Sequence, residues 1–292
     1  EAESDFHGLN AKMIKNPEAS NREVLLLSEN GKAWQDIGIV KNGTYRIALK
    51  GMGEFNVKIG DKSFILKSNS LNFTYSLLFN HSSGKYRLEI TPLNAINLVK
   101  NPSFEKMLTG FPENWNISNI KDFKMGFDRG YEGKHSLKVS TTVTKEWTWS
   151  WIRSEPIDVE PGKEYLIITH MKVENAKTSH IPIEGYFADK KQWKQLRQIP
   201  PGVRGTGTYD WKEFSYILKI PKNVTKIRVV LNAGWVLDKS KGEAITWFDN
   251  IQVIPLEEAP KLDVIWLYST ETNQTIDQLF EVKEKPAKVL NY

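Results

Sequence analysis

The chain has 292 residues, of which 40 % are hydrophobic and 26 % charged, and 40 basic against 35 acidic residues give a net charge of +5. This length predicts two domains, and the composition excludes a wholly disordered chain. The basic residues are interspersed, so we expect no nucleic-acid partner, and the absence of cysteine excludes disulfides, thiolate zinc sites and cysteine nucleophiles.

Residues 1–94 are predicted to form the first β-sandwich domain. Apolar and polar residues alternate from Tyr45 to Leu49 and again from Tyr86 to Ile90. A period of two is typical of strands that bury one face. Turn-forming clusters such as Gly60-Asp61-Lys62 separate these stretches, as expected for a sandwich of short strands.

The segment 97–255 alternates in the same way and also carries six motifs in a fixed order. These motifs are Asn97–Glu105, Gly110–Trp115, Gly130–Val139, Val159–Tyr165, Trp211–Phe214 and Ile245–Val253. In this order they resemble the carbohydrate-binding modules that have a galactose-binding-like jelly-roll fold. The resemblance implies a second β-sandwich, with an oligosaccharide or polysaccharide as its partner and no catalytic activity of its own.

The last segment, residues 260–292, is too short to form its own core. Leu262 to Tyr268 reads as a strong strand, whereas the spacing of apolar residues from Thr275 to Lys285 predicts a short helix. We expect this segment to dock on one of the two domains; in the alternative, it is the start of a third domain. The predicted fold is therefore all-β, with two jelly-roll-like β-sandwiches and a short C-terminal β/helical segment.

The whole arrangement also resembles the soluble exterior region of archaeal membrane glycosyltransferases. That resemblance implies an extracytoplasmic protein, attached to a membrane region outside this chain, whose catalytic part is also elsewhere. No apolar run here approaches the ~18 residues of a transmembrane helix, and the polar start from Glu1 to Ser4 indicates no signal peptide. Six Asn-x-Ser/Thr sequons favour an exterior location: Asn42, Asn72, Asn80, Asn116, Asn223 and Asn273.

Two carboxylates in the second domain are candidate ligands of a metal ion. Glu105 ends the first motif and Asp249 lies in the last one, and the first and last strands of a jelly roll are neighbours. Both could converge with backbone oxygens from Gly133 to Ser136, and such an oxygen-rich site suits Ca²⁺. The resemblance also implies a structural calcium. In the alternative, Asp249 only caps a turn and Glu105 pairs with a lysine.

Tryptophan is abundant, with 10 residues, and its flat faces can stack on sugar rings as well as fill a core. Trp147, Trp149 and Trp151 follow one another with a period of two, which predicts one strand face opposite Ile152. A glycan, the neighbouring domain or the core could cover this row. Further aromatic residues in or beside loops are secondary candidates for the walls of a glycan site: Tyr186, Trp193 and Trp235.

Residues for catalysis are scarce. The five histidines have no metal-ligand spacing, and no nucleophile elbow or phosphate-binding loop is present. Glu146, Glu155 and Glu184 could in principle form the carboxylate pair of a glycosidase. We expect a non-catalytic glycan-binding region. A structural cell-surface array without a ligand and a glycoside hydrolase remain as alternatives.

Overall fold

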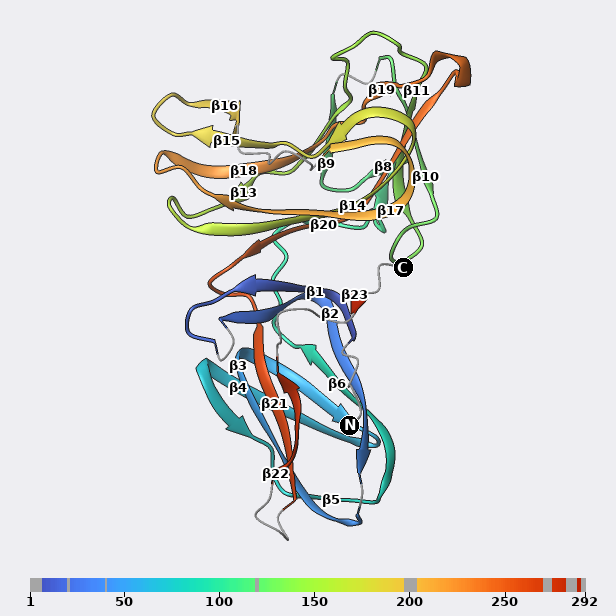
Figure 1. The fold of residues 1–292 in the computed structure, drawn as a ribbon. Coiled ribbons are helices and arrows are strands. Elements are labelled where there is room, and N and C mark those ends of the chain that lie inside the picture. Colours follow the sequence, from blue (N-terminus) through green and yellow to red (C-terminus); the bar gives the residue numbers. More distant parts are fainter. Residues whose placement is uncertain are drawn as a thin grey trace. The chain divides into compact units, whose positions relative to one another are not determined.

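A computed structural model describes residues 7–19, 22–39, 41–118, 121–196, 204–269, 275–281 and 288–289. Within these ranges every regular element is a strand except one 3-10 turn, η1 (Lys239–Lys241), which confirms the all-β prediction. No helix in the described part of the chain is long and apolar enough to span a membrane. The chain divides into unit 1, which runs to Ile96 and resumes at Glu257, and unit 2, from Asn97 to Leu256 (Figure 1).

Unit 1 is built on one sheet of long strands. Its strands are β1 (His7–Lys15), β2 (Glu23–Ile39), β3 (Gly43–Ile59), β4 (Lys62–Tyr75), β5 (Phe79–His81), β6 (Gly84–Pro92), β21 (Lys261–Ser269), β22 (Thr275–Glu281) and β23 (Lys288–Val289). Both β2 and β3 pair with β6 and also with β21, so the sheet closes on itself. The apolar residues that alternate along β2 and β3 fill the core inside.

The segment after Glu257 completes unit 1. β21 pairs with β3 along its whole length, and Leu262, Ile265 and Leu267 are buried in the core of the unit. The predicted helix over Thr275–Lys285 is wrong in its described part, because β22 is a strand paired with β21. The free edge of β21 supplies backbone partners along the segment, and this tertiary pairing overrides the helical spacing.

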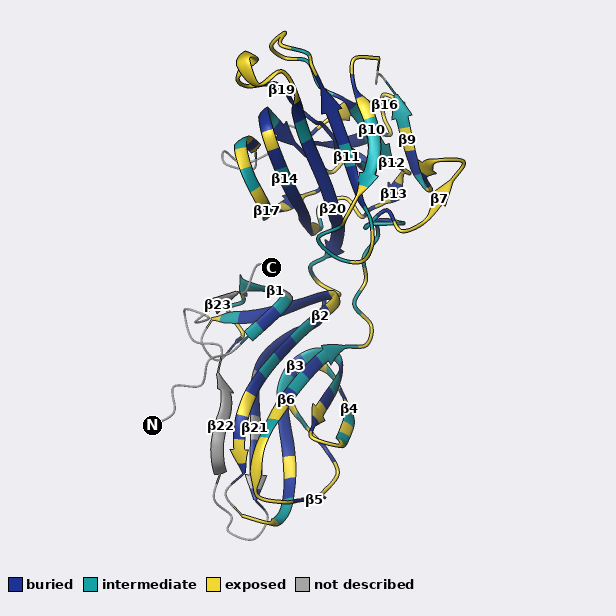
Figure 2. Ribbon diagram, turned by 90° about the vertical axis from the view of Figure 1, so that its right-hand side faces the viewer, coloured by how far each residue is buried: buried dark blue, intermediate teal, exposed yellow. Residues whose placement is uncertain are grey.

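Unit 2 is a sandwich of two sheets (Figure 2). Sheet one contains β10 (Lys124–Asp128), β11 (Ser136–Thr141), β20 (Ala244–Pro255), β14 (Glu164–His180) and β17 (Arg204–Lys219), with β19 (Trp235–Val236) paired to β14. Sheet two contains β16 (Gln192–Gln195), β15 (Ile183–Phe187), β18 (Val224–Leu231), β12 (Trp151–Ser154) and β9 (Trp115–Ser118), with β13 (Ile157–Asp158) paired to β18. A short hairpin of β7 (Met107–Leu108) and β8 (Phe111–Pro112) lies outside both sheets.

The core between the two sheets decides which side chains of sheet two face outward. Ile152 on β12 and Ile227 and Val229 on β18 are fully buried in that core. Because successive side chains of a strand point to opposite faces, Trp151 and Arg153 belong to the outer face. The same alternation assigns Arg228 on β18 to that face.

Candidate functional site

A carboxylate clamped by two arginines lies on the outer face of sheet two. Arg153 binds Glu184 on β15 in a bidentate arrangement, with Nε to Oε2 at 3.0 Å and Nη2 to Oε1 at 3.2 Å. Arg228 donates to the same Oε2 from β18. Arg153 also donates to Oγ of Ser118 at 2.6 Å. These contacts fix both guanidinium planes on the sheet.

Each guanidinium lies over an indole ring. Arg153 lies 4.9 Å from the ring centroid of Trp151, and Arg228 lies 4.4 Å from that of Trp193 on β16. Tyr186 on β15 packs beside Trp193, with ring centroids 5.5 Å apart. We call this set the aromatic–arginine face, and it consists of Trp151, Arg153, Glu184, Tyr186, Trp193 and Arg228.

The aromatic–arginine face carries a net positive charge. Burial alone would raise the pKa of Glu184, but the hydrogen bonds from Arg153 and Arg228 outweigh it and hold the pKa below its ordinary value. Two guanidinium groups therefore face one ionised carboxylate. Their remaining N–H groups can donate to hydroxyl or carboxylate oxygens of a ligand.

A pocket of about 440 Å³ lies next to this face, between β9, β12 and β18. Arg153 and Arg228 line it together with polar groups of the neighbouring strands and loops. The other lining residues are Asn114, Trp115, Asn116, Ser154, Glu155 and Pro156. The face therefore offers apolar rings, and the adjoining pocket offers several converging polar groups.

The structure separates the three tryptophans that the spacing placed on one strand face. Only Trp151 is on a strand; Trp147 and Trp149 lie in the loop before β12, so the prediction of a continuous row is wrong. The loop turns at Trp147, whose φ of 65° is rare for a bulky residue. Nε1–H of Trp149 donates a hydrogen bond to the carbonyl oxygen of Thr178 at 3.2 Å. The Trp149 ring therefore lies toward β14 and not beside Trp151.

The two loop tryptophans form a separate cluster with Trp235. The ring centroids of Trp147, Trp149 and Trp235 are 5.5–5.9 Å apart. Trp235, predicted to be a wall of the glycan site, is only 2 % exposed and serves as the base of this cluster, whereas Trp147 is 68 % exposed. A strained loop that presents one exposed indole makes the cluster a second candidate surface.

A buried histidine beside this cluster makes the stability of unit 2 depend on pH. Burial lowers the pKa of His180 to about 4, although a hydrogen bond to the carbonyl of Thr178 opposes the shift, and Arg204 reinforces it. In the unfolded chain the His180 imidazole takes up a proton near pH 6.5. In the folded protein it takes up that proton only near pH 4. The contribution of His180 to stability is therefore complete above about pH 6.5 and is lost as the pH falls toward 4.

We expect the His180→Gln variant to lose less stability than the wild type between about pH 7.5 and about pH 4.5, by up to about 3 kcal/mol. Denaturant titrations followed by tryptophan fluorescence report on unit 2, because eight of the ten tryptophans lie between Asn97 and Leu256. Parallel losses in the two proteins would contradict the assignment to His180.

The two predicted metal ligands reach the same loop, Gly130–His135, by different contacts. Glu105 accepts hydrogen bonds from the backbone N–H groups of Lys134, at 2.6 Å, and His135, at 2.9 Å. Asp249 is fully buried and accepts from the backbone N–H of Glu132 at 3.0 Å. Burial raises the pKa of Asp249 to about 7, and no cationic side chain pairs with it among the described residues.

The oxygens around Asp249 fit a calcium ion. A Cβ added to Gly130 would lie 2.5 Å from the carbonyl oxygens of Glu132 and His135 and 2.8 Å from Oδ2 of Asp249. Three oxygens thus converge where only a glycine leaves room, and oxygen atoms are the ligands that Ca²⁺ takes. In the described part of the chain no three acidic or histidine side chains cluster around a metal position, so backbone oxygens would have to complete the site.

Two further residues of the predicted metal site, Gly133 and Ser136, also shape the loop Gly130–His135. Gly133 has a φ of 71°, and any Cβ there would collide with Oε1 of Glu105. Ser136 donates its hydroxyl to the carbonyls of Asp128 and Arg129 at 3.3 and 3.1 Å. Both residues shape the turn that brings Glu105 to its backbone partners.

The three glutamates that are candidates for glycosidase chemistry are all ion-paired. Glu146 pairs with Lys177 at 3.1 Å and Glu155 with Lys100 at 3.3 Å, while Glu184 has its two arginines. A glycosidase acid needs a raised pKa, and that of Glu184 is lowered. None of the three has the environment of a general acid.

Comparison with known proteins gives one family match. Residues 96–241 match the family model described as a carbohydrate binding domain. Proteins with curated descriptions give no match.

Similar solved structures include a module named Family 16 Carbohydrate Binding Module-2, at 17 % identity, over 54 % of this chain and 99 % of that one, with a TM-score of 0.38. The tandem CBM22 domain of Paenibacillus barcinonensis Xyn10C is 11 % identical over 86 % of this chain and 93 % of its own, with a TM-score of 0.36. A xylan-binding domain from CBM 22 is 12 % identical, over 56 % of this chain and 97 % of that one, with a TM-score of 0.37.

Proposed function

The chain belongs to a family of carbohydrate-binding domains through residues 96–241, and on this premise we propose that unit 2 binds an oligosaccharide on its aromatic–arginine face without catalysing a reaction. Trp151, Tyr186 and Trp193 would stack on the apolar faces of sugar rings. Arg153 and Arg228 would donate hydrogen bonds to the hydroxyl groups. Glu184 holds both arginines in place for this role.

The observation that carries the proposal is the pairing of each half-buried indole with an immobilised guanidinium. Trp151 on β12 and Trp193 on β16 are separated by β18 and β15, so three strand spacings, about 14 Å, lie between them. A platform of this length suits a chain of several sugars better than a single sugar. The adjoining pocket of about 440 Å³ would take one end of that chain.

Calorimetric titration with an oligosaccharide selected from a glycan array tests the proposal. Trp151→Ala and Trp193→Ala should each weaken binding about ten- to thirtyfold, which corresponds to roughly 1.4–2 kcal/mol for one stacking ring. Trp147→Ala is the matched control, because this indole is exposed and belongs to the other surface. It should change the affinity by less than about threefold.

The same titrations distinguish the two surfaces of unit 2. Loss of binding in Trp147→Ala, with unchanged binding in Trp151→Ala and Trp193→Ala, would place the ligand on the tryptophan cluster and reject the aromatic–arginine face. Thermal melts of the three variants separate lost binding from lost folding.

We further propose that a structural calcium ion binds beside Asp249. Oδ2 of Asp249 and the carbonyl oxygens of Glu132 and His135 would hold it, with Glu105 fixing the loop that carries these carbonyls. The ion would supply the positive charge that the buried carboxylate otherwise lacks. Its role would be to tie the loop Gly130–His135 to β20.

An exterior location and attachment to a membrane region remain part of the proposal. They are supported by the number of Asn-x-Ser/Thr sequons in the sequence, an argument that requires no particular one of the six asparagines to be modified. The open reading frame of the full-length protein tests this, since transmembrane helices flanking these residues are expected.

A further inference from the structure

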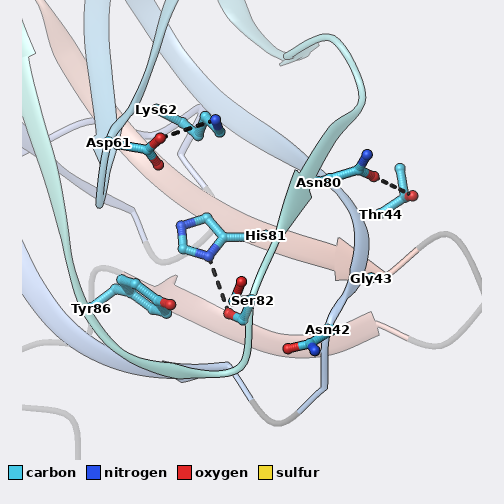
Figure 3. Close-up of a pocket in the computed structure, with 9 residues that line it drawn as sticks. All are labelled: Asn42, Gly43, Thr44, Asp61, Lys62, Asn80, His81, Ser82 and Tyr86. Atoms are coloured by element: carbon cyan, nitrogen blue, oxygen red, sulfur yellow. Dashed lines mark hydrogen bonds and ion pairs between the residues drawn. The ribbon is translucent and has the colours of Figure 1, made fainter.

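Unit 1 contains a second polar pocket, of about 610 Å³, at the end of the unit where the β3–β4 turn meets β5 (Figure 3). Unit 1 lies outside the segment that matches the carbohydrate-binding family. The lining consists mainly of amide, hydroxyl and aromatic groups: Asn42, Gly43, Thr44, Asp61, Lys62, Asn80, His81, Ser82 and Tyr86. Such a set can donate and accept several hydrogen bonds within one small volume.

Two asparagines on one side of the pocket are oriented by their oxygen atoms. Oδ1 of Asn42 accepts from the backbone N–H of Ser83 at 2.7 Å, and Oδ1 of Asn80 accepts from the hydroxyl of Thr44 at 2.8 Å. Neither Nδ2 has a partner within the described ranges. Each amide therefore keeps two N–H donors for a ligand.

Two rings form the other side of the pocket. His81 and Tyr86 meet edge to face, with centroids 4.1 Å apart, and both lie opposite the asparagines in Figure 3. Nδ1 of His81 lies 3.1 Å from the carbonyl oxygen of Ser82, so Nδ1 carries the proton and Nε2 is an acceptor. This Nε2 is buried, and within the described part of the chain it has no partner.

The charges of the pocket cancel. Lys62 donates to Asp61 at 3.0 Å, and this hydrogen bond holds the pKa of the Asp61 carboxyl below its usual range. The carboxylate is thus ionised beside one ammonium group, and the amide, hydroxyl and phenol groups of the lining are uncharged. A neutral ligand meets no net electrostatic penalty here, whereas a charged ligand must compete with the existing ion pair.

We propose that this pocket is a second carbohydrate site, which binds one neutral sugar residue. The asparagine N–H groups would donate to ring hydroxyls and Asp61 would accept from them. The rings of His81 and Tyr86 would contact the apolar C–H face. This site does not depend on the aromatic–arginine face of unit 2, because the two share no residue.

The test follows the side-chain NH₂ signals of Asn42 and Asn80 by heteronuclear NMR, during titration of the full chain with methyl glycosides of glucose, galactose, mannose and xylose. The protein is made in a host that does not glycosylate, since both asparagines lie in sequons. We expect saturable shifts of both signals with at least one glycoside at concentrations up to about 50 mM, where a ligand with a millimolar Kd is bound.

Three asparagine-to-aspartate variants provide the matched comparison. Asn42→Asp and Asn80→Asp keep the oxygen that accepts from Ser83 or Thr44 but lose the N–H donors, so binding should weaken at least about fivefold. Asn56→Asp is the control, because Asn56 makes a similar side-chain bond to Ser63 outside the pocket. Absence of shifts with all four glycosides, or equal weakening in all three variants, would overturn the proposal. Shifts of unit 2 signals alone would also overturn it while leaving the aromatic–arginine face intact.

Discussion

Replacing Glu184 with alanine is expected to destabilise unit 2 by about 3 kcal/mol, because it leaves two fixed guanidinium groups without their shared carboxylate. The side chain of Glu184 is 10 % exposed, and those of Arg153 and Arg228 are about one-fifth exposed, at 20 % and 23 %. Partial access to water keeps the expected value at the lower end of the range for a broken buried pair. Denaturant unfolding followed by tryptophan fluorescence measures it.

The Glu184→Ala variant should also weaken oligosaccharide binding more than either tryptophan variant. Without the carboxylate, the guanidinium groups of Arg153 and Arg228 can move away from the rings of Trp151 and Trp193. The ligand then loses the ordered arginine donors and the fixed rings at the same time. Glu184→Gln, which keeps one acceptor oxygen, should lose less of both stability and binding.

Glu155→Ala is the control for charge removal. Glu155 lines the pocket beside the aromatic–arginine face, but its carboxylate pairs with an exposed lysine, Lys100, and such pairs contribute less than about 1 kcal/mol. Equal destabilisation by Glu155→Ala and Glu184→Ala would show that the bonds from Arg153 and Arg228 to Glu184 contribute no more than an exposed ion pair.

The strands of this protein were predictable because most of them bury one face. The alternation from Tyr45 to Leu49 corresponds to fully buried positions inside unit 1, as the pattern requires. The segment Thr275–Glu281 was misassigned because its apolar spacing is ambiguous over a few residues. Its structure is decided by the edge of β21, a partner that no local pattern reveals.

The candidate site was predicted only in part, because it joins three separate stretches of the sequence: β12, the hairpin of β15 and β16, and β18. The aromatic character of Trp151, Tyr186 and Trp193 predicts these three members of the site, whereas the sequence makes Glu184 a candidate only for a catalytic acid. The arginines were missed, although Arg228 interrupts the apolar strand Val224–Leu231 and Arg153 lies two residues after Trp151. An arginine in such a strand signals an outward-facing ion pair, but its partner depends on strand order.

The period-two spacing of Trp147 and Trp149 does not correspond to a strand. A strand would place both beside Trp151, but the left-handed conformation at Trp147 ends any regular pairing before β12 begins. The signal for a loop was weak, since no glycine or proline interrupts Lys145 to Arg153. Side-chain bonding of Trp149 to Thr178 decides the conformation instead.

Removal of calcium should lower the Tm of unit 2. Binding to the folded state alone adds RT ln(1 + [L]/Kd), about 2.7 kcal/mol at a hundredfold excess of ion over Kd, and a chelator withdraws this contribution. Without the ion, the buried carboxylate of Asp249 has only backbone N–H donors to offset its desolvation. Thermal melts in EDTA and in excess Ca²⁺ measure the difference.

Asp249→Asn should abolish the response to chelator while preserving most of the loop, because its amide oxygen can still accept from the backbone of Glu132 or Asn250. Asp128→Asn is the matched control, since Asp128 is a half-exposed carboxylate on neighbouring β10 that bonds Arg129 and Trp247. It should keep the full calcium response. Identical melts of the wild type with and without chelator, together with no bound metal by elemental analysis, would reject the calcium site. Asp249 would then be a buried acid whose raised pKa leaves it partly protonated at neutral pH.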